Sequence, residues 1–88
     1  MHCGVAACVT KSLFSPAYRR LRTWLVDARH AQGLTQHQLA ALLGQPQSFV
    51  SKYERGERRL DFVEVLEITD TLRVDACDLI AELKRPPD

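Results

Sequence analysis

Two short helix patterns follow one another almost without a gap in the stretch LTQHQLAALLGQPQSFVSKYERG, residues 34–56. The first pattern opens at Thr35 and stops at Gly44, and the second restarts at Pro46 and closes at Gly56. Glycine ends both patterns because it tolerates the positive φ that terminates many helices, and proline suits the first turn of the next helix. We therefore expect two helices joined by a turn of about four residues, the arrangement called a helix-turn-helix.

The second of these helices carries polar side chains on its outer face, namely Gln47, Ser48, Ser51 and Lys52. Their amide, hydroxyl and ammonium groups donate and accept hydrogen bonds, so this face is suited to recognising polar groups of another molecule. A short turn makes the two helices cross steeply, and the small residue Ala40 is expected where they touch.

Three further helix patterns flank this pair and indicate an all-α fold of five helices. Ser15 before Pro16 predicts the start of a helix that runs from about residue 17 to residue 31. Two more helices are expected from Asp61 and Asp75, and Asp78 stands at the capping-box position of the last one. None of these helices is long enough to persist alone in water, so their apolar faces must pack together. The residues expected to face inward are Leu21, Leu25, Ala28, Leu39, Ala40, Leu43, Val50, Tyr53, Phe62, Val65, Leu66, Thr69, Leu72, Leu79, Ile80 and Leu83.

All five helices are expected in one domain, because 88 residues lie near the lower limit for a self-sufficient core. We expect an N-terminal arm at residues 1–14, the helical domain at 15–84 with its helix-turn-helix at 35–55, and a C-terminal tail at 85–88. No apolar run is long enough to span a membrane. The opening MHCGVAACVT lacks the basic segment of a signal peptide, so a cytoplasmic protein is expected.

The charges divide the chain into two parts. Residues 17–59 hold eight basic and three acidic side chains, whereas residues 60–88 hold three basic and eight acidic ones. A polyanion would be attracted to the first part and repelled by the second. The alternative is that the charges serve only solubility, in which case so clean a separation of basic and acidic residues would not be expected. The split favours a nucleic-acid surface on the first part, although the net charge of +1 alone would not.

The cysteines do not predict a metal site. Cys3, Cys8 and Cys77 are odd in number and lack CxxC spacing. His2 could add a ligand, but a fourth has no obvious source. We therefore expect reduced, incidental thiols and no cofactor. The sequence also lacks a nucleophile with a matching base and a phosphate-binding loop, so no enzymatic activity is expected.

The stretch 34–56 and its flanks resemble the DNA-binding domain of the lambdoid phage repressor and Cro group, the XRE-type regulators. The matching elements are GLTQ, the pair LA with LG shortly after it, VSKYERG, and the closing pattern of Leu72, Val74, Asp75, Leu79 and Ile80. The likeness extends over residues 21–80. It implies the five-helix lambda-repressor-like fold, in which the first helix of the motif crosses the phosphate backbone and the second enters the major groove.

The resemblance also implies roles for individual residues. The start of the second helix of the motif matches base-contacting positions, and the chemistry agrees, since glutamine can bond adenine and lysine can bond guanine. Phosphate contacts supply affinity without sequence information. The implied base contacts are Gln47, Ser48 and Lys52, joined by Ser51 on the same face, and the implied phosphate contacts are Gln36, Arg55, Arg58 and Arg59. Arg29 and Glu54 match a pair that forms a structural salt bridge in this group.

Several positions depart from the family pattern, among them Val26, Leu42 and Val63, which are apolar where the family is usually polar. Pro46 stands where the family usually has a capping serine or threonine, so the helix could start one residue earlier or lose its side-chain cap. Arg73 replaces the usual glycine after the fourth helix, which predicts a strained or altered turn. Trp24 falls at a position that is usually polar, and it would need a partner surface or cover from Leu13 and Phe14 in the arm.

The expected function is sequence-specific DNA binding that regulates transcription, as a repressor that acts as a homodimer on a near-palindromic operator in double-stranded DNA. One helix reads few base pairs, whereas two helices about 34 Å apart double the readout. The last helix and the acidic C-terminal part are the expected dimer surface. A phage-type repressor, an antitoxin that represses its own operon and a restriction-modification controller remain open within this class.

The alternative from another class is a protein-interaction module. Such a module would keep the helical scaffold and bind a partner, for instance a toxin, through the apolar residues Trp24, Leu42 and Val63.

Overall fold

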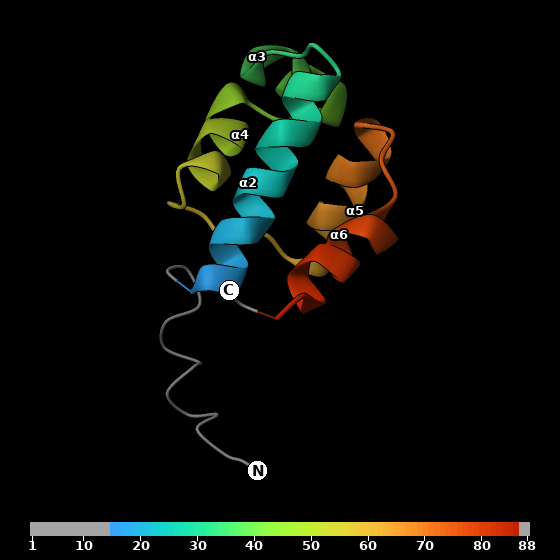
Figure 1. The fold of residues 1–88 in the computed structure, drawn as a ribbon. Helices are drawn as coiled ribbons and strands as arrows, with labels where there is room; N and C mark the ends of the chain where they lie inside the picture. The colour runs from blue at the N-terminus through green and yellow to red at the C-terminus, as the bar shows by residue number, and fades with distance from the viewer. Residues whose placement is uncertain (1–14, 87–88) are drawn as a thin grey trace.

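The computed structural model describes residues 15–86, which form helices joined by short turns (Figure 1). In chain order the helices are α2 (Pro16–Ala31), α3 (Gln36–Leu43), α4 (Gln47–Glu54), α5 (Phe62–Thr71) and α6 (Ala76–Lys84). The predicted five-helix, all-α fold is confirmed over this part of the chain. The expected arm at residues 1–14 lies outside the described residues, and so do His2, Cys3 and Cys8.

Side-chain caps start α3 and α6 at the residues that the sequence predicts. The hydroxyl of Thr35 accepts a hydrogen bond from the backbone N–H of Gln38, whose side chain accepts one from the N–H of Thr35 in return, so the predicted capping box forms. At α6 the carboxylate of Asp75 accepts from the N–H of Cys77, and the predicted capping box with Asp78 is wrong. An aspartate at that position is one methylene shorter than the glutamate or glutamine that reaches back in a capping box.

Helices α2 to α5 end in turns of one kind, in which two backbone N–H groups bond back to the last carbonyls of the helix. The residue at the bend has positive φ in each case: Gly33 at 71°, Gly44 at 69°, Gly56 at 79° and Arg73 at 61°. Arg73 is the only non-glycine residue with positive φ in the described part of the chain. The strain predicted for this turn is therefore present, because a Cβ is unfavourable in the left-handed region.

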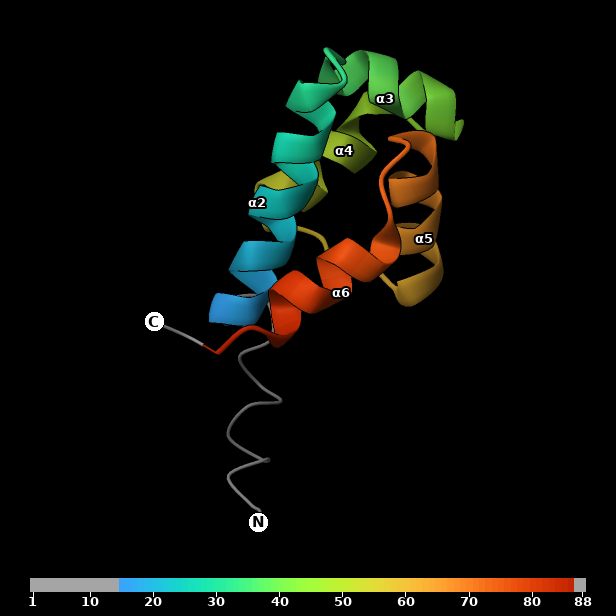
Figure 2. The ribbon, with the colours of Figure 1, turned by 45° about the vertical axis from the view of Figure 1, so that its right-hand side comes forward.

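Helix α2 runs through the middle of the domain, with α4 packed on one side and α6 on the other (Figures 1 and 2). Helix α3 lies across one end and contacts both α4 and α5. Ala40 is 1% exposed, in keeping with its expected place where α3 meets a neighbour. The buried apolar residues are Leu21, Leu25, Ala28, Leu39, Ala40, Phe49, Val50, Tyr53, Ile68, Leu72 and Leu79.

Three residues expected inside the core are instead exposed on α5 and α6. Phe62 is 66% exposed, Leu66 39% and Ile80 43%, so the inward orientation predicted for them is wrong. Helix α5 carries more apolar side chains than one face can bury. The core takes the stripe that contains Ile68 and Leu72, four residues apart, and Ile68 was missing from the predicted set.

Trp24 on α2 is half-buried and packs against the core. It is therefore less exposed than its place in the sequence suggests. Leu13 and Phe14, the residues considered as its cover, lie outside the described residues. Between residues 15 and 86, no helix combines the length and the apolar character needed to cross a bilayer.

Candidate nucleic-acid interface

Helix α4 divides into a buried face and an open face. Phe49, Val50 and Tyr53 point into the core, and the rings of Phe49 and Tyr53 meet edge to face with centroids 5.5 Å apart. The opposite face holds the residues expected to contact bases: Gln47, Ser48 and Lys52 are exposed, and Ser51 is partly exposed. The amide and ammonium groups of this face are thus available to a molecule outside the protein.

The N-terminus of α4 has no side-chain cap. Pro46 is the N-cap residue, with φ −68° and ψ 155°, so the expectation that it lies inside the first helical turn is wrong. Proline has no side-chain oxygen to accept a hydrogen bond from the first turn. The helix begins at Gln47 and lacks the cap that a serine would supply, which is the second of the two outcomes expected for Pro46. The first-turn N–H groups of α4 therefore receive no side-chain acceptor, and the N-terminus of a helix favours an anion.

The carboxylate of Glu54 joins three helices near the C-terminus of α4. Nε of Arg29 lies 2.8 Å from Oε2, and Nη2 of Arg29 lies 3.0 Å from Oε1. Nε2 of Gln36, from the start of α3, donates to Oε1 at 2.8 Å. Arg29 also donates to the carbonyl of Leu34 at 2.8 Å. Glu54 therefore fixes α4 against α2 and α3. Gln36, which was expected to contact a phosphate, donates one of its two amide N–H groups to Glu54.

Arg22 adds a further connection from α2 to the end of α4. Its Nη1 donates to the backbone carbonyl of Glu54 at 3.3 Å. The guanidinium also lies against Gly56, close enough that a Cβ at that position would stand 3.0 Å from Cζ of Arg22. This close approach, together with the φ of +79°, favours glycine at position 56.

Two of the arginines expected at phosphates are held by carboxylates. Arg55 binds Glu57 through two hydrogen bonds of 2.9 and 3.0 Å. Arg58 binds Glu64 through two hydrogen bonds of 2.8 and 3.0 Å, and its guanidinium lies 4.7 Å from the centroid of the Phe49 ring. These hydrogen bonds from Arg58 lower the pKa of Glu64 below its ordinary 4.5.

Comparison with known proteins agrees with this geometry. A family model described as Helix-turn-helix matches residues 25–79, more than half of the chain. A solved XRE-family-like protein from Pseudomonas syringae pv. tomato str. DC3000 is 43% identical, with a TM-score of 0.78, over 88% of this chain and 94% of that one. The chain belongs to the XRE family of helix-turn-helix proteins. The XRE domain also superposes on the restriction-modification controller protein C.Esp1396I, with a TM-score of 0.71 over 78% of this chain and 91% of that one. At 23% identity that likeness shows the fold alone.

None of the curated protein sequences gives a significant match to this XRE-family chain. Membership in the family makes the chain a DNA-binding regulator of transcription. Within the matched range, α3 and α4 form the helix-turn-helix.

Sequence reasoning did not find the two carboxylates that hold Arg55 and Arg58 in the XRE domain. A signal was available for one of them, because Glu57 follows Arg55 by two residues and the turn at Gly56 brings them together. The partner of Arg58 is six residues away and depends on how α5 approaches α4. Arg59 and Lys52 form no ion pair within residues 15–86, and both are exposed.

Proposed function

We propose that this XRE-family regulator is a sequence-specific repressor that places α4 in the major groove and binds a near-palindromic operator as a homodimer. One observation carries the proposal. Helix α4 exposes Gln47, Ser48 and Lys52 while its other end is fixed to the domain through Glu54. A rigidly held helix with a polar outer face can keep its side chains in register with base edges, which sequence readout requires.

The exposed face of α4 supplies the base contacts in this proposal. The Gln47 amide can donate to N7 and accept from N6 of adenine, and the Lys52 ammonium can donate to O6 and N7 of guanine. Ser48 and Ser51 add hydroxyl groups on the same face; the Ser51 hydroxyl donates to the Ser48 carbonyl at 3.4 Å and can turn toward a ligand.

Phosphate contacts come from the ends of the motif. Arg59 is exposed and outside any ion pair of the described residues, so of the three arginines expected at phosphates it alone can bind one without giving up a carboxylate. Gln36 retains a second amide N–H, and Arg55 and Arg58 can bind phosphate by exchanging it for their carboxylates. Each contact adds affinity without sequence preference and makes binding more sensitive to salt.

A second copy of the chain is the proposed occupant of an apolar groove between α5 and α6. The floor of the groove includes Leu21 and Leu79, and its edges carry the exposed side chains of Phe62, Leu66 and Ile80. Burying these groups against the same groove of a partner would give an isologous contact. The interface would lie away from the basic α4 region, as an operator-binding dimer requires.

Selection from a random DNA pool followed by mobility-shift titration tests DNA recognition. We expect the chain to enrich a site with two related half-sites about one helical turn apart. Lys52→Ala should change the preferred bases, whereas Arg59→Ala should weaken all sequences alike and reduce the salt slope by about 0.9. No enriched site, or the same preference in Lys52→Ala, would contradict the proposal. A reporter fused to the enriched site should lose transcription when the chain is expressed.

Sedimentation measurements test the dimer surface. Ile80→Glu and Phe62→Glu each place a charge in the groove and should yield monomers that bind a single half-site more weakly. Leu42→Glu is the matched control, because Leu42 is also exposed, at 62%, but lies on α3 outside the groove. Equal sedimentation of all three variants and the unmodified chain would overturn the assignment of this groove.

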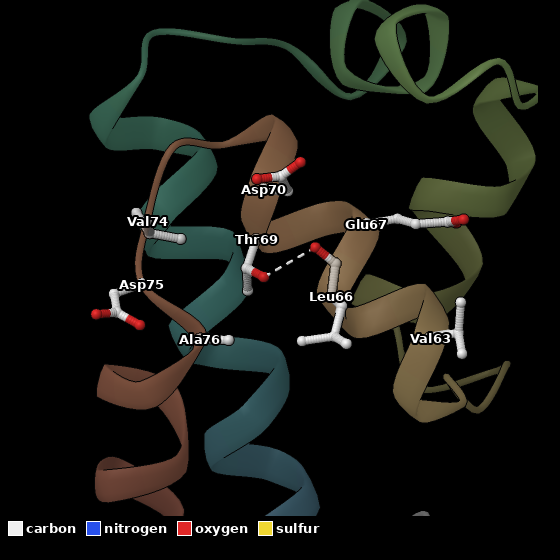
Figure 3. Close-up of a pocket in the computed structure, with 8 residues that line it drawn as sticks. All are labelled: Val63, Leu66, Glu67, Thr69, Asp70, Val74, Asp75 and Ala76. Atoms are coloured by element: carbon white, nitrogen blue, oxygen red, sulfur yellow. Dashed lines mark hydrogen bonds between the residues drawn. The ribbon is translucent and has the colours of Figure 1, made fainter.

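A second candidate function, binding of a partner protein such as a toxin, is favoured by a hollow beside α5 (Figure 3). Val63, 61% exposed, and Leu66 supply apolar surface there, and Glu67, Asp70 and Asp75 supply carboxylates. This chemistry suits a basic segment with apolar side chains. A partner that binds the unmodified chain but not Val63→Glu, with no DNA site enriched, would favour this function over the first.

A further inference from the structure

The ion pair between Arg55 and Glu57 is held in place by the end of α4. The backbone N–H of Glu57 donates to the carbonyl of Lys52 at 2.8 Å, and that of Gly56 donates to the carbonyl of Tyr53 at 3.2 Å. This turn sets Glu57 directly after the helix. Its carboxylate then takes both hydrogen bonds from the Arg55 guanidinium.

Glu57 faces the same surface as the residues proposed to read DNA. It lines a shallow depression together with Ser48 and Lys52, and the Lys52 ammonium is near enough to favour its ionised form. The hydrogen bonds from Arg55, with Lys52 adding to their effect, lower the pKa of Glu57, so the carboxylate is ionised at neutral pH. A negative charge thus stands where a polyanion would approach.

We propose that Glu57 limits the sequence-independent part of DNA binding by holding Arg55 in an ion pair that a phosphate must displace. The inference rests on the proposed function and identifies a residue that sets how strongly the protein binds any duplex. The pair carries no net charge, so Arg55 attracts DNA only after the exchange. The exchange is feasible because the two side chains are 56% and 55% exposed, and exposed ion pairs are weak.

The exchange has a defined signature in salt dependence. Each phosphate neutralised by a protein cation steepens the plot of log affinity against log salt by about 0.9. If Glu57→Gln frees Arg55 for one phosphate, the variant should bind DNA more tightly than the unmodified chain. The ratio of the two affinities should be roughly threefold larger at 50 mM than at 200 mM salt. This affinity ratio should be the same for every DNA sequence, because phosphate contacts do not distinguish bases.

The experiment titrates four chains against two duplexes of equal length, one enriched by the unmodified chain and one of random sequence, over a salt series. The chains are the unmodified protein, Glu57→Gln, the double variant Arg55→Ala with Glu57→Gln, and Asp27→Asn. Asp27→Asn is the matched control because it removes one exposed carboxylate from α2, on the side that faces α6. Thermal unfolding of each chain verifies that the fold is retained.

We expect Glu57→Gln to bind both duplexes more tightly than the unmodified chain, with a steeper slope of log affinity against log salt. The double variant should lose this gain in affinity. Asp27→Asn should bind like the unmodified chain. The inference is overturned if Glu57→Gln keeps the original slope, if the double variant keeps the gain, or if Asp27→Asn shows it too. A changed base preference in Glu57→Gln would also overturn it, since Glu57 would then contact bases. Binding of neither duplex by the unmodified chain would instead refute the DNA-binding proposal itself.

Discussion

The guanidinium of Arg29 and the carboxylate of Glu54 form an ion pair inside the domain, with Nε and Oε2 2.8 Å apart and side chains only 9% and 6% exposed. Gln36 donates a third hydrogen bond to the same carboxylate. A buried charge needs such partners, because removal from water is costly unless hydrogen bonds replace the lost hydration. The pair thereby determines how α4 presents its outer face, although neither residue lies on that face.

Arg29→Met should destabilise the protein strongly. Methionine fills much of the space but leaves the Glu54 carboxylate buried with Gln36 as its remaining side-chain donor, a situation that typically costs about 3–5 kcal/mol. Urea denaturation measures the loss. Arg55→Ala is the control, since it breaks an ion pair that is exposed to solvent and should leave the midpoint nearly unchanged. A similar midpoint for the two variants would show that burial of the Arg29 pair is unimportant.

Alanine at Gly56 should be more harmful than alanine at Gly44. Both glycines have φ near +70 to +80°, where a Cβ costs roughly 1–2 kcal/mol. A Cβ at position 44 meets nothing within 4 Å, whereas one at position 56 also collides with the Arg22 guanidinium at 3.0 Å. Thermal unfolding should therefore order the melting temperatures as unmodified chain, Gly44→Ala, Gly56→Ala. Equal melting temperatures of the two variants would mean that Arg22 moves aside at no cost, and the reverse order would contradict the prediction.

Arg73→Gly should stabilise the protein. Arg73 adopts φ 61° at the bend after α5, where glycine avoids the strain of the left-handed region. Glycine makes the unfolded chain more flexible, which offsets part of the strain that is relieved. The free energy of unfolding should still rise by about 1 kcal/mol, which corresponds to a melting temperature higher by roughly 4–8 °C. Calorimetry would test this, with Arg73→Ala as the control that keeps the strain. An unstable Arg73→Gly would indicate that the arginine side chain contributes more than its backbone costs.

Removal of the hydroxyl should have opposite effects at Tyr53 and at Tyr18. Tyr53 is fully buried, burial raises the pKa of its phenol, and its hydroxyl has no hydrogen-bond partner among the described residues. Tyr53→Phe should therefore raise the free energy of unfolding by about 1 kcal/mol. The Tyr18 hydroxyl accepts a hydrogen bond from the N–H of Leu60 at 2.6 Å, so Tyr18→Phe should lower it by about 1 kcal/mol. Destabilisation by Tyr53→Phe would reveal a partner for its hydroxyl.

The helix starts and ends could be predicted from the sequence because they depend on neighbours within a few residues. Thr35 and Gln38 cap each other across one turn, and Gly44 and Gly56 bend the chain where it must leave the helix. The same local logic predicted strain at Arg73. It failed at Asp78, where side-chain length rather than spacing decides whether a capping box forms.

Which apolar residues are buried could be predicted only in part. Leu21 and Leu25 on α2 lie on a single narrow stripe, and both are buried as expected. Helix α5 offers more than one apolar stripe, so the periodicity allows Phe62 or Ile68 to face inward. The contacts of α5 with α3 and α6 select Ile68 and leave Phe62 exposed.

The sequence by itself determined the five helices, the turn between α3 and α4, and the polar outer face of α4, because capping, backbone conformation and periodicity act over a few residues. Only the tertiary structure decided the states of the arginines that follow α4. Arg58 is drawn to Glu64 on the next helix, whereas Arg59 remains open to solvent. Ion pairing and burial depend on which elements meet in space, so the sequence pattern alone presents all of these arginines as equivalent cations.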